Sequence, residues 1–152
     1  MASHNVIGVI GAAECSKEIE QLAYTVGKEI AKRKAILVCG GMGGVMEAAC
    51  RGAKSQGGIT VGILPGKDKH EGNPFIDIPI ITDMGHARNV LVVRSSDILI
   101  AISGSYGTLS EIAIALKVKK NVIGIDTWDC NLPIIKVDSP NEAVEKAISL
   151  IP

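Results

Sequence analysis

The chain has 152 residues, and its sixteen basic and sixteen acidic side chains give a formal net charge of zero. This balance provides no general electrostatic attraction to nucleic acid or to a membrane surface, so we expect neither partner, and any anion site must be local. The length fits one domain spanning residues 1–152.

The composition restricts the kind of core and the kind of site. Hydrophobic residues make up 47% of the chain but aromatic residues only 3%, so the core must be built from aliphatic side chains, as in a buried parallel sheet. The four cysteines lack the pairwise spacing of a zinc site, and we expect reduced thiols and no metal. The first residues lack the pattern of a secretory signal, and no apolar run reaches membrane-spanning length, so we expect a cytoplasmic location.

Short apolar runs alternate along the chain with segments of helical periodicity. The runs that predict strands are Val6 to Ile10, Ala35 to Cys39, Thr60 to Leu64, Ile78 to Ile81, Asp97 to Ile102, Val122 to Ile125 and Ile134 to Val137. The helical segments are one that follows Ser16 and extends to Ile30, then Val45 to Ala53, Val90 to Val93, Leu109 to Lys117 and Pro140 to Leu150. This alternation predicts an α/β fold, a Rossmann-like three-layer sandwich with a mostly parallel sheet and a nucleotide-binding character.

Glycine-rich or small-residue turns follow three of the predicted strands, at the sheet edge where such folds bind ligands. They contain Gly11, the group Gly40, Gly41, Gly43 and Gly44, and the segment from Ser103 to Thr108. The second turn does not match a dinucleotide fingerprint, because its last required glycine is Met46, and the third has no lysine of a P-loop. The glycines of the second turn serve either tight strand–helix packing or a pocket floor.

The turn after Ile102 has the properties of an anion site. Its candidate ligand-binding residues are Gly104, Ser105, Tyr106, Gly107 and Thr108. Small residues let backbone N–H groups approach an anion closely, and a helix start favours negative charge. We expect Thr108 to cap the helix and a phosphate to bind there.

Two charged residues are candidates for chemistry beside this turn. Glu111 lies in the first helical turn, where it either complements the helix dipole or acts at a sugar carbon. Arg88 follows Gly85 and precedes a buried apolar run, so it is either a surface charge or a guanidinium that reaches a phosphate or sugar. His86 and Asn89 are candidate neighbours in the same pocket.

Two further features concern surfaces and motion. The segment from Ile112 to Leu116 is apolar all round, which predicts contact with another subunit in a homodimer or homotetramer. The interval from Pro65 to Asp77 carries glycines and charges that allow motion over a pocket.

Taken together, these residues resemble the Lonely Guy superfamily, whose members carry Pro-Gly-Gly-x-Gly-Thr-x-x-Glu after a strand, an earlier Gly-Gly-Gly loop and an Arg-Lys pair between them. The matching positions are Gly104, Gly107, Thr108, Glu111, the loop from Gly40 to Gly44, and Arg88. The chain departs from the pattern with Ser103 for Pro, Ser105 for the second Gly and Asn89 for Lys. In this region it is more similar to a shorter branch that includes molybdenum cofactor carrier proteins. Members of the group are often labelled lysine decarboxylases, but the chain has no recognisable pyridoxal-phosphate lysine site.

The resemblance implies two functions. The first is a nucleoside 5′-monophosphate phosphoribohydrolase, which releases free base and ribose 5-phosphate without a metal or cofactor. In that enzyme Glu111 and Arg88 would be catalytic, and the two glycine turns with Asn89 would hold the substrate. The alternative is a non-catalytic carrier that uses the same turns for the phosphate of a molybdopterin-type cofactor.

Overall fold

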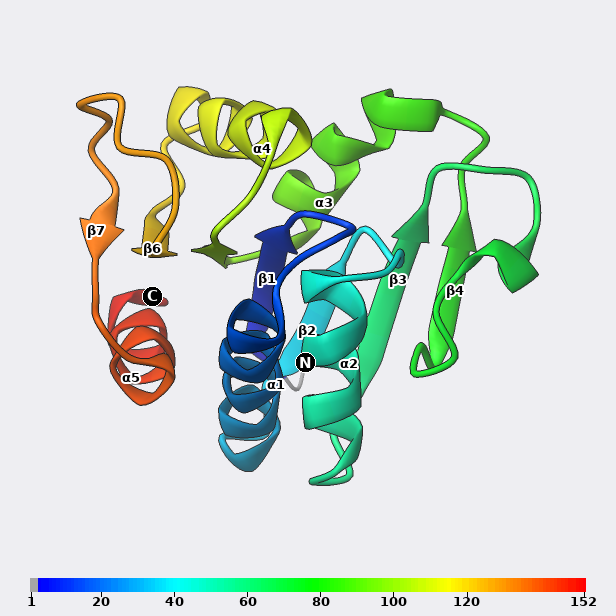
Figure 1. The fold of residues 1–152 in the computed structure, drawn as a ribbon, viewed down its shortest axis with the longest axis horizontal. Helices are drawn as coiled ribbons and strands as arrows, with labels where there is room; N and C mark the ends of the chain where they lie inside the picture. Colours follow the sequence, from blue (N-terminus) through cyan, green and yellow to red (C-terminus); the bar gives the residue numbers. More distant parts are fainter. Residues whose placement is uncertain (1–2) are drawn as a thin grey trace.

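The computed structural model describes residues 3–152, which form one parallel sheet with helices on both faces (Figure 1). The strands are β1 (Val6–Gly11), β2 (Ile36–Cys39), β3 (Thr60–Leu64), β4 (Ile78–Ile81), β5 (Ile98–Ile102), β6 (Val122–Ile125) and β7 (Ile135–Lys136). Their order across the sheet is β4-β3-β2-β1-β5-β6-β7, and every paired neighbour runs parallel. The chain order therefore reverses between β1 and β5, the position where open α/β sheets bind ligands.

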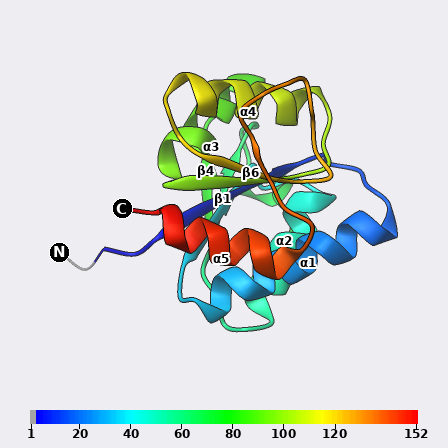
Figure 2. The same ribbon diagram turned by 90° about the vertical axis from the view of Figure 1, so that its left-hand side faces the viewer.

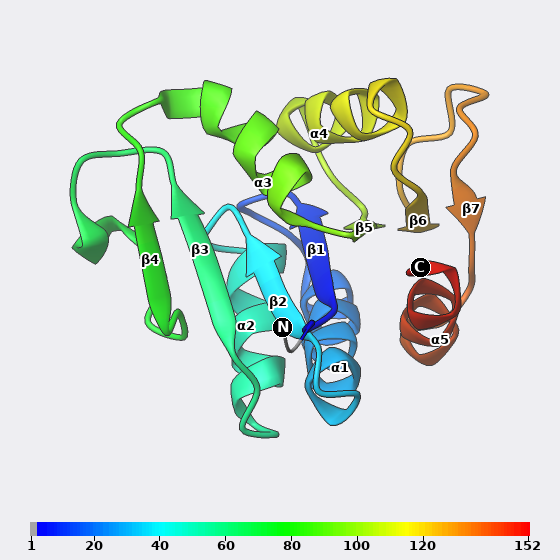
Figure 3. The same ribbon diagram turned by 180° about the vertical axis from the view of Figure 1, so that it is seen from behind.

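Five helices complete a three-layer sandwich within the described residues (Figure 2). They are α1 (Lys17–Lys32), α2 (Val45–Lys54), α3 (Asn89–Ser95), α4 (Tyr106–Lys117) and α5 (Pro140–Leu150). The first, second and fifth cover one face of the sheet, and α3 and α4 cover the other, as the view from behind also shows (Figure 3). The predicted Rossmann-like sandwich is confirmed, and its sheet is parallel throughout.

Strand β5 shows why the strands of this sheet are continuous apolar runs in the sequence. All five of its residues are buried, because both faces of the sheet are covered. Ile98, Ile100 and Ile102 pack in the core under α1, α2 and α5, whereas Leu99 and Ala101 pack in the core under α3 and α4.

Two glycines bring α1 and α2 into direct contact. A Cβ on Gly27 would lie 1.8 Å from the carbonyl oxygen of Ala49, and one on Gly52 would lie 1.9 Å from that of Tyr24. Any side chain at either position would force the helices apart. The start of α2 is held beside the end of β1 by the N–H of Val45, which donates to the carbonyl of Ala12 at 3.0 Å.

Helix α4 begins at Tyr106, three residues before the predicted start at Leu109. Ser103 and Gly104 have positive φ angles of 48° and 125°, so the chain turns within two residues and Ser105 becomes the N-cap. Thr108 was expected as the cap, but it lies in the first helical turn, where its Oγ1 accepts a hydrogen bond from the Ser105 N–H at 3.3 Å.

The interval from Pro65 to Asp77 contains a short 3₁₀ turn, Lys69–Glu71, and is attached to the glycine loop through Asn73. The backbone N–H of Asn73 donates to the carbonyl of Gly41 and its side-chain amide to that of Met42, each at 2.9 Å. The loop therefore supports the glycine turn, and its motion over a pocket stays a prediction.

The apolar segment of α4 packs largely within its own layer. Ile112 and Ala115 are buried, Ile114 and Leu116 are half-buried, and Ala113 is exposed. The homodimer or homotetramer stays a prediction. Among residues 3–152, no helix combines the length and the hydropathy needed to cross a bilayer. The cytoplasmic location also stays a prediction.

Candidate functional site

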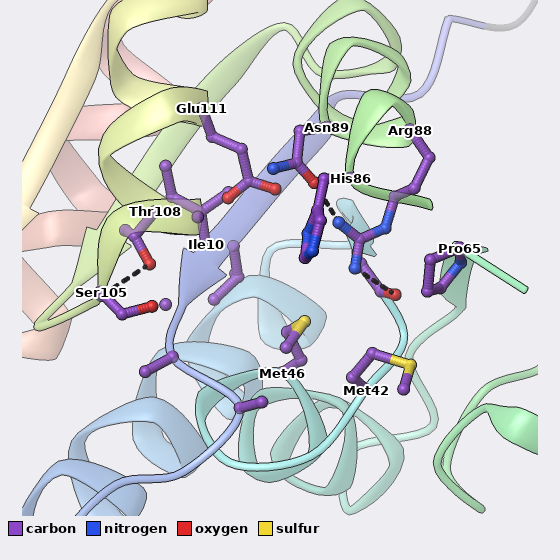
Figure 4. Close-up of a pocket in the computed structure, with 16 residues that line it drawn as sticks. Ile10, Met42, Met46, Pro65, His86, Arg88, Asn89, Ser105, Thr108 and Glu111 are labelled. Carbon is purple, nitrogen blue, oxygen red and sulfur yellow. Dashed lines mark hydrogen bonds between the residues drawn. The ribbon is translucent and has the colours of Figure 1, made fainter. Parts of the chain in front are cut away.

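A cavity of about 240 Å³ opens where the strand order reverses (Figure 4). Its walls come from the end of β1, the glycine loop after β2, the 3₁₀ turn Gly85–Arg88 with the start of α3, and the start of α4. The three predicted turns thus meet at one site, because parallel strands end at the same edge of the sheet.

The start of α4 presents its backbone to the cavity through Ser105, Gly107 and Thr108. Helix geometry leaves the first-turn N–H groups without intrahelical acceptors, and they carry the positive end of the helix dipole. Gly107 adopts an ordinary helical conformation, and a Cβ placed on it would meet no heavy atom within 4 Å. Neither the backbone nor the packing of the described residues therefore requires a glycine there.

The two other residues predicted in this turn do not line the cavity. Gly104 serves the turn itself, because a Cβ on it would lie 2.6 Å from the Cβ of Thr108. Tyr106 is 83% exposed and stacks on Trp128, with ring centroids 5.9 Å apart. Trp128 donates its indole N–H to the carbonyl of Ser105 at 3.0 Å, so the aromatic pair holds the turn from outside.

The glycines at the ends of β1 and β2 differ in whether they reach the cavity. Gly11 and Gly40 line it and are also tightly packed, since an added Cβ would lie 2.5 Å from Cγ1 of Val45 and 2.6 Å from Nη2 of Arg88, respectively. Gly41 instead packs on Leu64, whose Cδ2 would lie 2.3 Å from an added Cβ. Gly43 and Gly44 pack against the carbonyls that follow β1, and a Cβ on Gly44 would lie 2.3 Å from the oxygen of Ala12. For these last three glycines, tight packing is the structural role, and they lie outside the cavity wall.

Arg88 lines the cavity but is only 8% exposed, because the protein itself holds its guanidinium. Nε donates to the carbonyl of Ile63 at 2.9 Å, Nη2 to that of Gly40 at 3.3 Å, and Nη1 to Oδ1 of Asn89. The alternative of a surface charge is therefore wrong. Burial lowers the pKa of Arg88 and the carboxyl of Glu111 opposes that shift, but a guanidinium stays protonated in proteins.

Glu111 is 6% exposed and lines the cavity opposite Arg88 (Figure 4). Burial raises the pKa of its carboxyl to about 8, although the charge of Arg88 acts in the other direction. The carboxyl is therefore largely protonated at neutral pH, and it can donate a hydrogen bond to an anion instead of repelling it.

The remaining wall contains one predicted neighbour and several residues that the sequence did not indicate. His86, expected with Asn89 in the same pocket, is exposed and lines the cavity two residues before Arg88. Met42, Met46 and Pro65 add an apolar side. Pro65 directly follows β3, so the rule that ligands bind at strand ends would have found it.

A parallel sheet with helices on both faces and a cavity at its switch point defines the class of Rossmann-like proteins. Within that class, residues 4–149 match the SLOG cluster4 family, and the chain belongs to this family. The predicted relationship to Lonely Guy proteins is confirmed by relatives such as cytokinin riboside 5′-monophosphate phosphoribohydrolase LOG5 of Arabidopsis thaliana, 33% identical over 106 residues. That match covers 67% of this chain but only 45% of the plant protein, so the chain spans less than half the length of this relative.

Other similar proteins match along almost their whole length. An uncharacterised protein of Archaeoglobus fulgidus is 53% identical over 143 residues, which are 94% of each chain. The molybdenum cofactor binding protein of Rippkaea orientalis is 37% identical with a TM-score of 0.94 and covers 100% of both chains. The molybdenum cofactor carrier protein of Chlamydomonas reinhardtii is 34% identical with a TM-score of 0.84 and covers 97% of this chain and 98% of its own.

Proposed function

We propose that the cavity binds the phosphate of a pterin-type ligand and that this chain is a molybdenum cofactor carrier. The observation that carries the phosphate site is Gly107. Gly107 is the second residue of α4, and glycine is a poorer helix former than alanine. Since a Cβ on Gly107 would meet no heavy atom within 4 Å, packing among residues 3–152 does not account for the glycine, whereas a ligand that approaches the helix backbone would.

The charges of the cavity suit a bound anion. The α4 N-terminus and the guanidinium of Arg88 supply positive potential from two sides, and the largely protonated Glu111 adds a hydrogen-bond donor. Met42, Met46 and Pro65 offer an apolar surface for a planar ring. The cavity is smaller than the roughly 300–1,000 Å³ of sites that enclose a whole ligand. It therefore suits a phosphate with an adjacent ring better than a fully enclosed molecule.

The choice of cargo rests on the similar proteins. Molybdenum cofactor binding and carrier proteins match this chain from end to end, whereas the phosphoribohydrolases match about two thirds of it. Asn89 stands where the Lonely Guy pattern has a lysine, so the site has one cation fewer. The amide of Asn89 forms hydrogen bonds with Arg88 and Ser110. Both facts favour holding a ligand over converting it.

A second candidate, a nucleoside 5′-monophosphate phosphoribohydrolase, is favoured by the placement of Glu111 and Arg88 in one cavity. In this reaction water would add to C1′ of the ribose while the C–N bond breaks and its electron pair leaves with the base, which takes up the proton that the water loses. An ionised Glu111 would stabilise the positive ribose or direct the water, and Arg88 would orient the substrate. Because the Glu111 pKa is about 8, this activity would rise as the pH approaches 8.

The test separates the two candidates on one preparation. Ligand released from freshly purified protein is identified by absorbance, fluorescence after oxidation and mass, and the protein is then incubated with a panel of nucleoside monophosphates. A bound pterin without base release supports the carrier. Free base that depends on Glu111, and disappears in Glu111→Gln, supports the hydrolase and overturns the carrier. If neither pterin phosphates nor nucleotides bind, the phosphate site itself is wrong.

A further inference from the structure

A continuous path of hydrogen bonds joins the anion-binding start of α4 to Arg88 through side chains. The hydroxyl of Ser110 donates to the carbonyl of Gly107 at 2.6 Å and accepts from Nδ2 of Asn89 at 2.9 Å. Oδ1 of Asn89 in turn accepts from Nη1 of Arg88 (Figure 4). The path links two features that both face the cavity but belong to different helices.

Arg88 continues the path to the opposite wall. Its Nη2 reaches the carbonyl of Gly40 in the glycine loop, and its Nε reaches the carbonyl of Ile63 at the end of β3. A guanidinium has five N–H groups, and these three partners use three of them, which leaves two N–H groups without a hydrogen bond to these partners. The bonds to the protein therefore decide where the remaining N–H groups point.

The members of the path differ in exposure, which makes one of them a clean probe. Asn89 is 4% exposed and lines the cavity, so its replacement would disturb both packing and ligand. Ser110 is exposed and is not part of the cavity wall. Its hydroxyl nevertheless binds both neighbours at once: it donates to the carbonyl of Gly107 and accepts from Nδ2 of Asn89.

We propose that Ser110 is a positioning residue of the ligand site, which through Asn89 fixes the Arg88 guanidinium relative to the backbone N–H groups at the start of α4. This inference rests on the proposed role of that helix start and Arg88 in binding phosphate. A ligand held from both sides needs the two sets of donors at a fixed separation, and without the Ser110 hydroxyl the amide of Asn89 loses its acceptor.

Inorganic phosphate binding measured by calorimetry tests the proposal with Ser110→Ala. We expect the affinity to fall roughly fivefold, in the range of interactions lost within one hydrogen-bond network. Ser110→Thr keeps a hydroxyl able to bond the preceding turn and should restore most of the affinity. The matched control is Ser149→Ala, because Ser149 is also exposed and donates to the carbonyl of Lys146 three residues earlier, at 2.7 Å, on α5.

A second measurement needs no ligand. Exchange of the Arg88 side-chain N–H protons with water, followed by NMR, should become faster in Ser110→Ala and stay unchanged in Ser149→Ala and Ser110→Thr. If Ser110→Ala changes neither this exchange nor the phosphate affinity, the proposal is overturned. If the exchange accelerates but the wild-type protein binds no phosphate, the hydrogen-bond path stands and the proposed function fails.

Discussion

Arg88 and Glu111 face one cavity from two different helical segments, and the charge of Arg88 lowers the pKa of the Glu111 carboxyl that burial raises. The guanidinium nevertheless gives its hydrogen bonds to Asn89 and to the carbonyls of Ile63 and Gly40. Because burial prevails, the pKa remains at about 8. The pair therefore presents a cation and a largely neutral acid at pH 7, which is suited to an anionic ligand.

The raised pKa of Glu111 makes stability depend on pH. The folded state holds the proton more tightly than the unfolded chain, whose carboxyl has the ordinary value of 4.5, so the free energy of unfolding should fall as the pH rises from about 4.5 to about 8. Glu111→Gln removes this decline and should be more stable than the wild type by up to about 5 kcal/mol at pH 8.5, with little difference at pH 4. Urea unfolding across this pH range measures it. The control Glu145→Gln changes an exposed carboxylate on α5, and an equal effect there would contradict the assignment.

Gly107 should show opposite effects on stability and binding. Alanine is the better helix former and meets no neighbour there, so Gly107→Ala should raise the free energy of unfolding by about 0.5–1 kcal/mol. The added methyl should weaken phosphate binding about tenfold or more, because it stands where the ligand approaches the backbone. Thermal unfolding and calorimetry measure the two effects. Gly104→Ala is the contrast, since positive φ and contact with Thr108 make it destabilising. Full phosphate affinity in Gly107→Ala would remove the main support for the site.

Replacing the buried guanidinium should destabilise the fold as well as the site. Arg88→Met leaves the carbonyls of Ile63 and Gly40 and the amide oxygen of Asn89 without this donor, and we expect a loss of about 2–4 kcal/mol in the free energy of unfolding. Chemical denaturation measures the loss, with the exposed Arg94→Met as the matched control. Similar stabilities for both variants would show that the hydrogen bonds of Arg88 contribute little.

Trp128 is the only tryptophan in the chain and should report on the proposed anion site. Its indole N–H donates a hydrogen bond to the carbonyl of Ser105, and Ser105 lines the cavity. Binding of phosphate to the α4 start should therefore change the tryptophan emission, and a fluorescence titration should give the same affinity as calorimetry. The response should be absent in Gly107→Val. Calorimetric binding without any change in emission would place the anion elsewhere.

The predicted association can be tested at the outer surface of α3 and α4. Val90 on α3 is 41% exposed, and Ala113 on α4 is also exposed. If this surface joins subunits, light scattering should show a dimer or tetramer, and Val90→Glu should shift it towards the monomer, because an unpaired charge would be buried. Val90→Thr is the conservative control. A monomeric wild-type protein at micromolar concentration would contradict the predicted homodimer or homotetramer.

Much of the fold followed from local signals. The helix predicted after Ser16 is α1, which Ser16 caps by accepting from the N–H of Ile19 at 3.2 Å, and α5 has the predicted bounds. The start of α4 was misplaced because the φ angles of Ser103 and Gly104 depend on the packing of the turn and are not visible in its composition. The roles of the glycines in the loop after β2 were ambiguous for a similar reason. Gly40 lines the cavity and Gly41 and Gly44 do not, and this difference depends on neighbours that are distant in sequence.

By itself, the sequence determined that apolar strands alternate with amphipathic helices and that small residues follow three strands, because periodicity and turn chemistry are local properties. That information was enough to select Glu111, Arg88 and the start of α4 as candidates. Only the tertiary structure decided which glycines face the cavity, that Arg88 is held by three protein acceptors, and that Ser110 joins it to Gly107. These relationships depend on contacts between segments far apart in the chain, and such contacts exist only once the sheet has brought the strand ends together.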